Sequence, residues 1–485
     1  MIGKFFAAAA CLSLASAAFP VLAADSAAAV LKRASAAMGA PKTIRYSGDG
    51  IGWTYGQAFQ PGKAWPKIDI QSQVRTLNYA NGSMREEIAF SRGEPQGGGG
   101  YPLSGQQKND QYVSGAYAWN VTPAGAVPGP RFVGDRTHQL WISPHGVLDA
   151  ASRNNATVTW QTKGKKTLAA VAFAEPGKFA ATAYLNDDYL VERVVSRVPD
   201  TVFGEVSVTT DYSNYRDFGG VKFPGRIQQS AGGYPVLDLT VKEAQPNVAA
   251  DFAMPDNVRT AAERVAMEKV ADGVWHVAGG SHNSVAIEMK DHLILVEAPL
   301  NDARSGLVVE EVKKLAPGKP IRYVINSHHH FDHAGGLRAA AASGATVLVH
   351  AQAKAFFDRA LATHSKIAPD LLTQSKRKAS VRAVKDRMTL TDGTRSVQIL
   401  SIVEGNHAEG FMMVYLPKER LLIEADAYTP IAPGAKPPSP ANANNVNLVV
   451  NLDAYRLGID KILPLHGRVV PVADLYTTAG RPQPK

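Results

Sequence analysis

The 485-residue sequence contains a single cysteine, Cys11, and after residue 24 it has no apolar run long enough to cross a bilayer. One cysteine excludes an intramolecular disulfide framework. Glycine (42 residues) and proline (30 residues) are only slightly more frequent than average, which excludes collagen-like and low-complexity chains. With 45% hydrophobic and 20% charged residues, the chain can bury a globular core, and its length suggests two or three domains.

The first 24 residues have the pattern of a secretory signal. Lys4 precedes an uncharged stretch of phenylalanine, alanine and leucine, which ends in small residues at Ala23 and Ala24. The segment is too short and too rich in alanine for a membrane span, and it predicts cleavage near Ala24. Acylation of Cys11, as in a lipoprotein, is less favoured because apolar sequence continues after it. We therefore expect an exported protein, periplasmic or secreted, with no thiol and no transmembrane segment.

Residues 25–250 have mostly the two-residue periodicity of β-strands, after one short helix at Ser26–Met38. Turn signals such as Asn81-Gly82 and Gly232-Gly233 separate the strand-like runs. The segment Tyr212–Pro224 resembles the last hairpin of the periplasmic lipoprotein-carrier-like half-barrels. This half is predicted to be a β-rich accessory domain, an antiparallel half-barrel with a helix against it.

The pattern changes after a polar linker rich in proline and asparagine, residues 251–267. In residues 268–485, strand-like runs alternate with helical ones, which indicates a layered domain of helices and strands. The predicted fold class is therefore α+β with two domains.

The most informative segment is His328-His329-His330-Phe331-Asp332-His333, which directly follows the apolar run Ile321–Ile325. In extended backbone, residues two apart project to the same side, so His328 and His330 can bind one ion while His329 points away. Asp332 and His333 come at the turn into the next helix and can reach a second ion. Imidazole and carboxylate ligands without thiolate suit zinc, and they do not exclude iron or manganese.

Three further candidate ligands each follow a short apolar run of their own. They are His407 after Val397–Val403, Asp426 after Arg420–Ala425, and His466 after Lys461–Leu465. In layered α/β domains, ligands gather at the carboxyl ends of strands. Four separate strand ends that supply histidine or aspartate therefore predict one shared metal site.

This set of residues is similar to the metallo-β-lactamase superfamily over about residues 268–470. The resemblance implies an αββα sandwich with a two-metal site at one edge. It implies that the first metal is bound by His328, His330 and His407, that the second is bound by Asp332, His333 and His466, and that Asp426 bridges the two. One departure is Glu297, at a strand end where the family usually has aspartate. It affects which residues form hydrogen bonds with the ligands, and it does not change the ligands themselves.

The resemblance also implies a reaction. Two neighbouring ions would share a hydroxide, and this metal-bound hydroxide would attack an ester, thioester, lactone or phosphoester of a small molecule, with Asp332 as the catalytic residue that orients it. Asp426 followed by Ala427 differs from the pattern of enzymes that open β-lactams. Two alternatives stay open: a β-lactam hydrolase, and a lipid or lipoprotein carrier with a metal-binding appendage.

Several other residues permit two interpretations. His282 lies in a turn that either overhangs the metals and contacts substrate or is simply exposed, and His329 is expected to lie behind the ligands or at the surface. Trp53, Tyr55, Trp65 and Trp119 either line a groove for a lipid or another apolar ligand or belong to an ordinary sheet core, which is favoured.

The net charge, 52 − 43 = +9, is spread along the chain and identifies no partner. A basic stretch between Lys376 and Arg387 is best explained as a solvated face. No nucleic-acid partner is expected.

Overall fold

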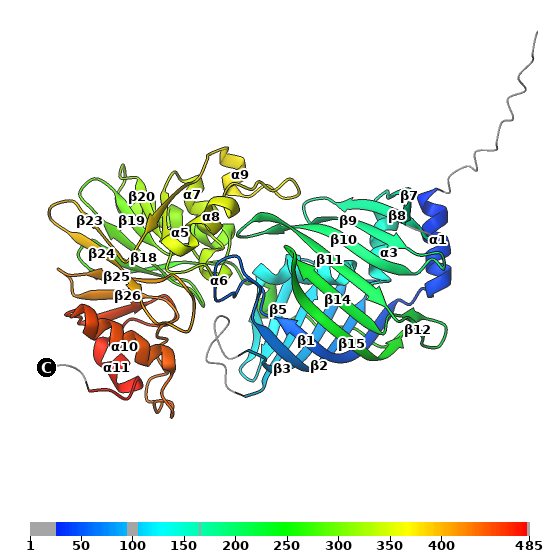
Figure 1. Ribbon diagram of the computed structural model, residues 1–485, viewed down its shortest axis with the longest axis horizontal. Helices are drawn as coiled ribbons and strands as arrows, with labels where there is room; N and C mark the ends of the chain where they lie inside the picture. The colour runs from blue at the N-terminus through cyan, green and yellow to red at the C-terminus, as the bar shows by residue number, and fades with distance from the viewer. Residues whose placement is uncertain (1–25, 95–104, 164–165, 483–485) are drawn as a thin grey trace, which may run out of the picture.

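The computed structural model describes residues 26–94, 105–163 and 166–482, so the predicted signal segment lies outside the described residues. The two halves of the chain lie side by side along the long axis of the molecule (Figure 1). Among the described residues, no helix is both long and apolar enough to cross a membrane.

The first half is built on one large antiparallel sheet of 13 strands, in the order β6-β5-β4-β3-β2-β1-β15-β14-β11-β10-β9-β8-β7. Its strands are β1 (Thr43–Trp53), β2 (Lys67–Asn78), β3 (Ser83–Arg92), β4 (Gln107–Ser114), β5 (Tyr117–Thr122), β6 (Gly125–Pro128), β7 (Thr157–Lys163), β8 (Lys166–Glu175), β9 (Phe179–Leu185), β10 (Val191–Asp200), β11 (Gly204–Ser213), β14 (Arg226–Ala231) and β15 (Tyr234–Pro246). β12 (Arg216–Asp217) and β13 (Lys222–Phe223) pair separately.

Helix α1 (Ala27–Met38) begins at Ser26, whose side chain accepts a hydrogen bond from the Ala29 amide, and it packs one apolar face on this sheet. The sequence predicts one helix here, but the structure also contains η1 (Pro130–Phe132), α2 (Val133–Trp141) and α3 (Gly146–Arg153). The two α-helices have only nine and eight residues, which is too short for a clear helical repeat, and their apolar residues join the same core as α1.

The second half contains two mixed sheets. The seven-stranded sheet runs in chain order through β16 (Ala266–Ala271), β17 (Val274–Ala278), β18 (Ser284–Glu288), β19 (Leu293–Val296), β20 (Ile321–Ile325), β21 (Thr346–His350) and β22 (Ser380–Val384). The six-stranded sheet runs through β23 (Arg387–Thr391), β24 (Ser396–Ile402), β25 (Phe411–Leu416), β26 (Leu421–Glu424), β27 (Lys461–Pro464) and β28 (Val470–Pro471).

Helices cover the outer sides of these sheets (Figure 1). They are α5 (Asp302–Leu315), α6 (Phe331–Ala334), α7 (Leu337–Ala342), η2 (Ala351–Ala353), α8 (Lys354–Ala360), α9 (Leu371–Ser375), α10 (Ala443–Tyr455) and α11 (Val472–Thr478). Strand β19 shows why both faces are covered: Leu293 and Leu295 join the core under α5, α7 and α8, whereas Ile294 and Val296 join the core shared with the second sheet.

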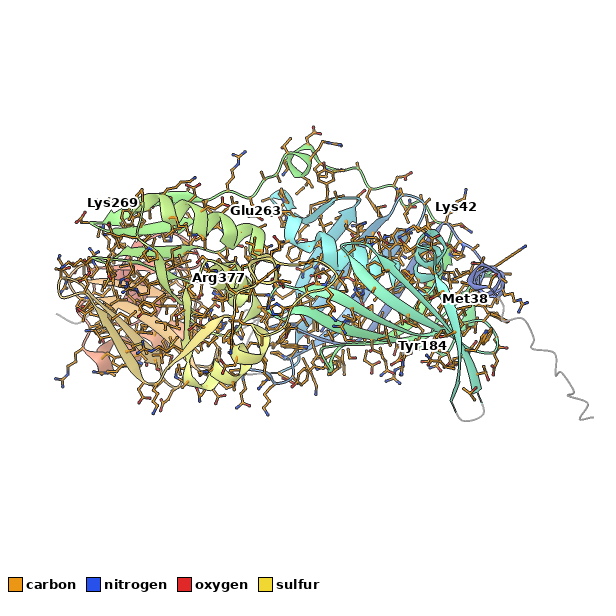
Figure 2. The ribbon with its side chains drawn as sticks, turned by 90° about the horizontal axis from the view of Figure 1, so that it is seen from above. Met38, Lys42, Tyr184, Glu263, Lys269 and Arg377 are labelled. Carbon is orange, nitrogen blue, oxygen red and sulfur yellow. The ribbon has the colours of Figure 1, made fainter. Side chains whose placement is uncertain are left out.

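The segment between the halves contains α4 (Asp256–Arg259), whose Asn257 amide side chain donates to the carbonyl of Ala126. Figure 2 shows Glu263 of this segment beside the junction, with Met38 and Lys269 toward opposite ends of the molecule. The predicted boundaries at residues 24, 250 and 267 stay predictions. A second connection is noncovalent: the loop from Thr54 to Pro66, between β1 and β2, reaches the second half beside α6.

Candidate metal centre

The seven predicted ligands lie together at one edge of the second half. His328 and His330 follow β20, Asp332 and His333 belong to α6, and His407, Asp426 and His466 come after β24, β26 and β27. The apolar strands end at the same edge, and their buried side chains fix the position of each loop that follows. Residues up to 138 positions apart in the sequence therefore meet in one site.

One cluster consists of His328, His330, His407 and Asp426. The His328 Nε2 atom lies 3.1 Å from Nε2 of His407 and 3.0 Å from Nδ1 of His330. All three histidines are buried. This group contains the three residues that the family resemblance implies for the first ion.

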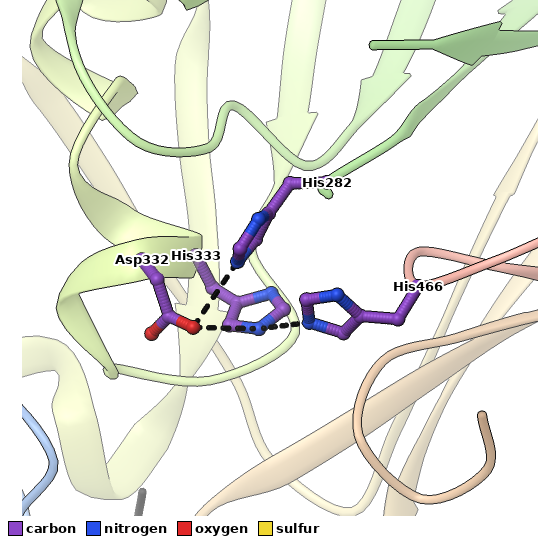
Figure 3. Close-up of side chains that lie close together, drawn as sticks. All are labelled: His282, Asp332, His333 and His466. Carbon is purple, nitrogen blue, oxygen red and sulfur yellow. Dashed lines mark hydrogen bonds and ion pairs between the residues drawn. The ribbon is translucent and has the colours of Figure 1, made fainter. Parts of the chain in front are cut away.

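The second cluster consists of His282, Asp332, His333 and His466 (Figure 3). Nε2 of His466 lies 3.1 Å from Nε2 of His333, and Nε2 of His282 lies 3.1 Å from Oδ2 of Asp332. The sequence leaves His282 open between a substrate contact and an exposed turn. In the structure His282 is buried beside Asp332, His333 and His466, and only 6% of its surface is exposed, so the exposed-turn interpretation is wrong. The sequence does not decide between the two interpretations, because His282 stands in a glycine-rich turn without a preceding ligand pattern.

The carboxylate of Asp426 lies between the two clusters. Its Oδ2 atom is 3.0 Å from Nε2 of His407, 3.3 Å from Nε2 of His328 and 2.8 Å from Nε2 of His333. Its Oδ1 atom is 3.0 Å from Nε2 of His466. A single carboxylate thus contacts imidazoles of both clusters, which is the position that the family resemblance implies for a bridging ligand.

Glu297 fixes the orientation of two of the imidazoles. Its Oε2 atom accepts hydrogen bonds from Nδ1 of His333 (2.7 Å) and from the Ser327 hydroxyl (2.8 Å), and that hydroxyl lies 2.9 Å from Nδ1 of His328. Its Oε1 atom accepts from the Ser327 amide and the Asn326 side chain. With both Nδ1 atoms donating, the Nε2 lone pairs of His328 and His333 face the site. The glutamate in place of the usual aspartate therefore supports the ligands.

Backbone carbonyls orient two more imidazoles. His466 donates from Nδ1 to the carbonyl of Ser281 (2.7 Å), and His330 donates from Nε2 to the carbonyl of Ala58 (3.1 Å). His329 is also buried and donates to the same Ala58 carbonyl at 2.7 Å. It therefore lies behind the ligands, as one of its two interpretations expects.

These tautomers make the site fit a pair of cations. Nε2 of His328 and Nδ1 of His330, 3.0 Å apart, are both lone-pair acceptors, because the other nitrogen of each ring donates elsewhere. Acceptors that face each other at this distance repel, and a cation between them removes the repulsion. Imidazole nitrogen and carboxylate oxygen are ligands that suit zinc.

The charges of the site lead to the same conclusion. Burial lowers the pKa of His328 and of His330 well below the ordinary histidine value, which keeps both imidazoles neutral, as metal ligands must be. Burial also opposes protonation of His333, yet the carboxylates of Asp426 and Asp332 raise the pKa of His333 well above its ordinary value. The two carboxylates therefore attract positive charge into the site, which a metal ion would supply.

The loop from Thr54 to Pro66 brings the first half of the chain into this site. The Gly56 carbonyl accepts from the Phe331 amide (3.1 Å), and the Gln57 side chain donates to Oδ1 of Asp332 (2.7 Å). Gly56 has φ = +79°, and a Cβ atom there would lie 2.6 Å from Cγ of Phe331, so only glycine permits this approach. The ring of Trp65 packs edge-on against Phe331. The loop is thus held on α6, the short helix that carries the predicted ligands Asp332 and His333.

Replacing Gln57 by alanine should lower kcat roughly tenfold to a hundredfold, the usual cost of removing a partner that orients a ligand. Without its donor, the Asp332 carboxylate can rotate away from the geometry that His282 and His333 share with it. Gln60→Ala in the same loop is the matched control, because Gln60 is exposed. Steady-state kinetics with metal analysis would test this, and equal activity of the two variants would contradict it.

Comparison with known proteins assigns the second half to a family. Residues 277–456 match the family model described as the metallo-beta-lactamase superfamily. The chain carries a metallo-beta-lactamase superfamily domain. The match includes six of the seven predicted ligands and ends ten residues before His466. With its two histidine-rich clusters, the domain is that of a metal-dependent hydrolase of this superfamily.

Solved structures similar to this chain include three metallo-beta-lactamases. The enzyme from Pontibacter korlensis is 16% identical, and the alignment covers 45% of this chain and 98% of that one, with a TM-score of 0.35. The enzyme from Hirschia baltica is 22% identical, and the alignment covers 45% of this chain and 99% of that one, with a TM-score of 0.34. FIM-1 from Pseudomonas aeruginosa, in its mono-zinc form, is 19% identical, and the alignment covers 44% of this chain and 93% of that one, with a TM-score of 0.32. No curated protein matches the chain.

Proposed function

We propose that the protein is an exported hydrolase that binds two metal ions, most simply zinc, and opens an ester, thioester, lactone or phosphoester of a small molecule. The observation that carries the proposal is the position of Asp426, whose two carboxylate oxygens contact imidazoles of both clusters. The alanine after it, Ala427, is buried and offers neither thiol nor hydroxyl to the site.

Two divalent ions in such a site act as Lewis acids and lower the pKa of bound water toward neutrality. The chain's own residues supply the orientation. Gln57 and His282 hold the two oxygens of Asp332 from opposite sides, at 2.7 Å and 3.1 Å. A carboxylate fixed in this way can accept a proton from the attacking water and keep that water aimed at the substrate.

The remaining parts of the proposal concern fold and location. We infer an αββα sandwich for the second half, supported by the helices on the outer side of each sheet, and a half-barrel for the first. Export rests on the sequence of residues 1–24. A direct test is to fractionate cells that express the full chain and to determine the N-terminal residue of the mature protein, which should lie next to Ala24.

The activity can be tested with the zinc-loaded protein and a panel of chromogenic esters, thioesters, lactones, phosphodiesters and the β-lactam nitrocefin. We expect hydrolysis of at least one of the first four classes. Removing metal with a chelator should lower that rate at least about a hundredfold, because several kcal/mol of transition-state stabilisation are lost, and zinc should restore it.

Faster turnover of nitrocefin than of every ester would favour the β-lactam alternative. No turnover of any substrate by a protein with two bound ions, together with lipid that co-purifies with it, would favour the carrier alternative.

A further inference from the structure

A cleft of about 780 Å³ lies between the two halves and opens on Asp332. Its volume is in the range that accommodates a small organic ligand. The first half supplies Tyr55, Arg131 and Asp135 to its walls, and the second half supplies Leu300 and Phe331. A substrate that reaches the metal site through this cleft would therefore contact both halves of the chain.

Most carboxylates in this cleft already have partners. Asp200 accepts hydrogen bonds from the Tyr55 hydroxyl (2.7 Å) and from the amides of Val202 and Phe203. Asp302 accepts from the Leu371 amide at 2.6 Å. These bonds satisfy the carboxylates and hold the walls of the cleft in place.

Asp370, a further carboxylate of the cleft, is also satisfied. It accepts from the Arg338 guanidinium at 2.7 Å and from the Thr373 amide at 2.8 Å. Like Asp200 and Asp302, it has a structural partner and needs none from a ligand.

Two charged groups differ from these, and both belong to the first half. Within the described part of the chain, neither the side chain of Arg131 nor that of Asp135 makes a hydrogen bond or an ion pair. The guanidinium of Arg131 rests on the ring of Phe132, 4.6 Å from its centroid. The neighbouring Arg136, by contrast, is buried and donates to the carbonyls of Tyr112 and Trp119. Arg136 is thus structural, whereas Arg131 is held by an aromatic ring with its donors available to the cleft.

The surroundings of these two groups increase their capacity to bind a ligand. Burial lowers the pKa of Arg131, and the charge of Asp332 opposes this effect. Asp135 faces the cleft, yet the surrounding protein desolvates it and Asp200 lies near it, so its pKa is raised to about 6. Both residues nevertheless stay exposed where they line the cleft, so a ligand can reach them, and a charge without a protein partner gains a charge-assisted hydrogen bond when a ligand supplies the partner.

We propose that the first half recognises the substrate: Arg131 binds a carboxylate of the substrate, Asp135 binds an ammonium or N–H group beside it, and the scissile bond then lies at Asp332. The inference rests on the proposed hydrolase function and names its substrate class, a small ester with an amino-acid-like end. The apolar walls at Tyr55, Leu300 and Phe331 contact the carbon chain between the charged end and the reacting bond.

Three matched 4-nitrophenyl esters test this with the zinc-loaded full chain: the neutral butyrate, the glutarate monoester that adds a carboxylate, and the glutamate γ-ester that adds an ammonium as well. We expect kcat/KM to rise in that order. Arg131→Gln should lower kcat/KM for the two carboxylate esters roughly tenfold to a hundredfold, mainly through KM, and should leave the butyrate unchanged. Asp135→Asn should affect the glutamate ester alone.

The control is Lys32→Gln on α1, an exposed cation at the end of the molecule away from the cleft, which should change none of the three rates. Equal loss on all three esters with Arg131→Gln, or no loss on any, would overturn the proposal. If the wild-type protein hydrolyses none of the esters, the hydrolase assignment for esters fails separately. Calorimetric binding of glutamate to the metal-loaded proteins would then decide the inference, since Arg131→Gln should weaken it at least about tenfold.

Discussion

Replacement of Asp426 by alanine should lower kcat/KM about a thousandfold or more, and the variant should bind fewer than two metal ions. The carboxylate contacts imidazoles of both clusters, so its loss removes a ligand from each ion at once. It also removes the carboxylate that lies 2.8 Å from Nε2 of His333, the nitrogen that faces the site. A loss of several kcal/mol of transition-state stabilisation corresponds to this factor, at about 1.4 kcal/mol for each tenfold.

The control for Asp426 is Asp460→Ala in the same domain. Asp460 is exposed and forms an ion pair with Arg420 at the surface, a type of pair that contributes little to stability. Kinetics together with metal analysis by mass spectrometry would compare the two. If Asp426→Ala keeps two ions and most of its activity, the carboxylate is not a ligand.

Replacement of Glu297 by glutamine should lower metal affinity roughly tenfold to a hundredfold and destabilise the domain by about 3 kcal/mol. Glu297 is fully buried and accepts hydrogen bonds from Nδ1 of His333, from the Ser327 hydroxyl and amide, and from the Asn326 side chain. A neutral amide cannot accept at both of its positions. At least one buried donor would lose its partner, and His333 or His328 would lose its fixed tautomer.

Glu419→Gln separates the effect on metal from the effect on stability. Glu419 is largely buried and pairs with Arg395 at 2.9 Å, and within the described residues its side chain forms no hydrogen bond or ion pair with a predicted ligand. The Glu419→Gln substitution should lower the free energy of unfolding without changing the affinity for metal. Chelator competition and denaturant unfolding measure the two quantities, and equal metal affinity of the Glu297 and Glu419 variants would contradict the role given to Glu297.

The sequence predicts which side chains come together at one edge of the second half, because its signal is local. The ligands come within a few residues of a short apolar run, and such runs become buried strands whose ends meet at one edge. Helix ends are predicted less well. The sequence suggests a helix at Leu452–Asp460, but α10 spans Ala443–Tyr455, so the predicted start and end are both wrong. The helix ends where Arg456 adopts a left-handed conformation with φ = +54°.

What the sequence does not predict are the contacts between the halves. Gln57 and Asp332 are 275 residues apart, and nothing in the Thr54–Pro66 loop marks it as part of a metal site. Among the aromatic residues weighed for an apolar groove, Trp119 stacks on Tyr112 inside the first half, whereas Tyr55 and Trp65 pack on Phe331 of the second. Side chains that act across a domain junction carry no periodicity, so only the tertiary structure reveals them.

The most direct test is anomalous diffraction from crystals of the zinc-loaded protein, recorded on both sides of the zinc absorption edge. The account predicts two anomalous peaks: one bounded by His328, His330 and His407, the other by Asp332, His333 and His466, with an oxygen of Asp426 within bonding distance of each. A single peak, or peaks that lie away from Asp426, would contradict it.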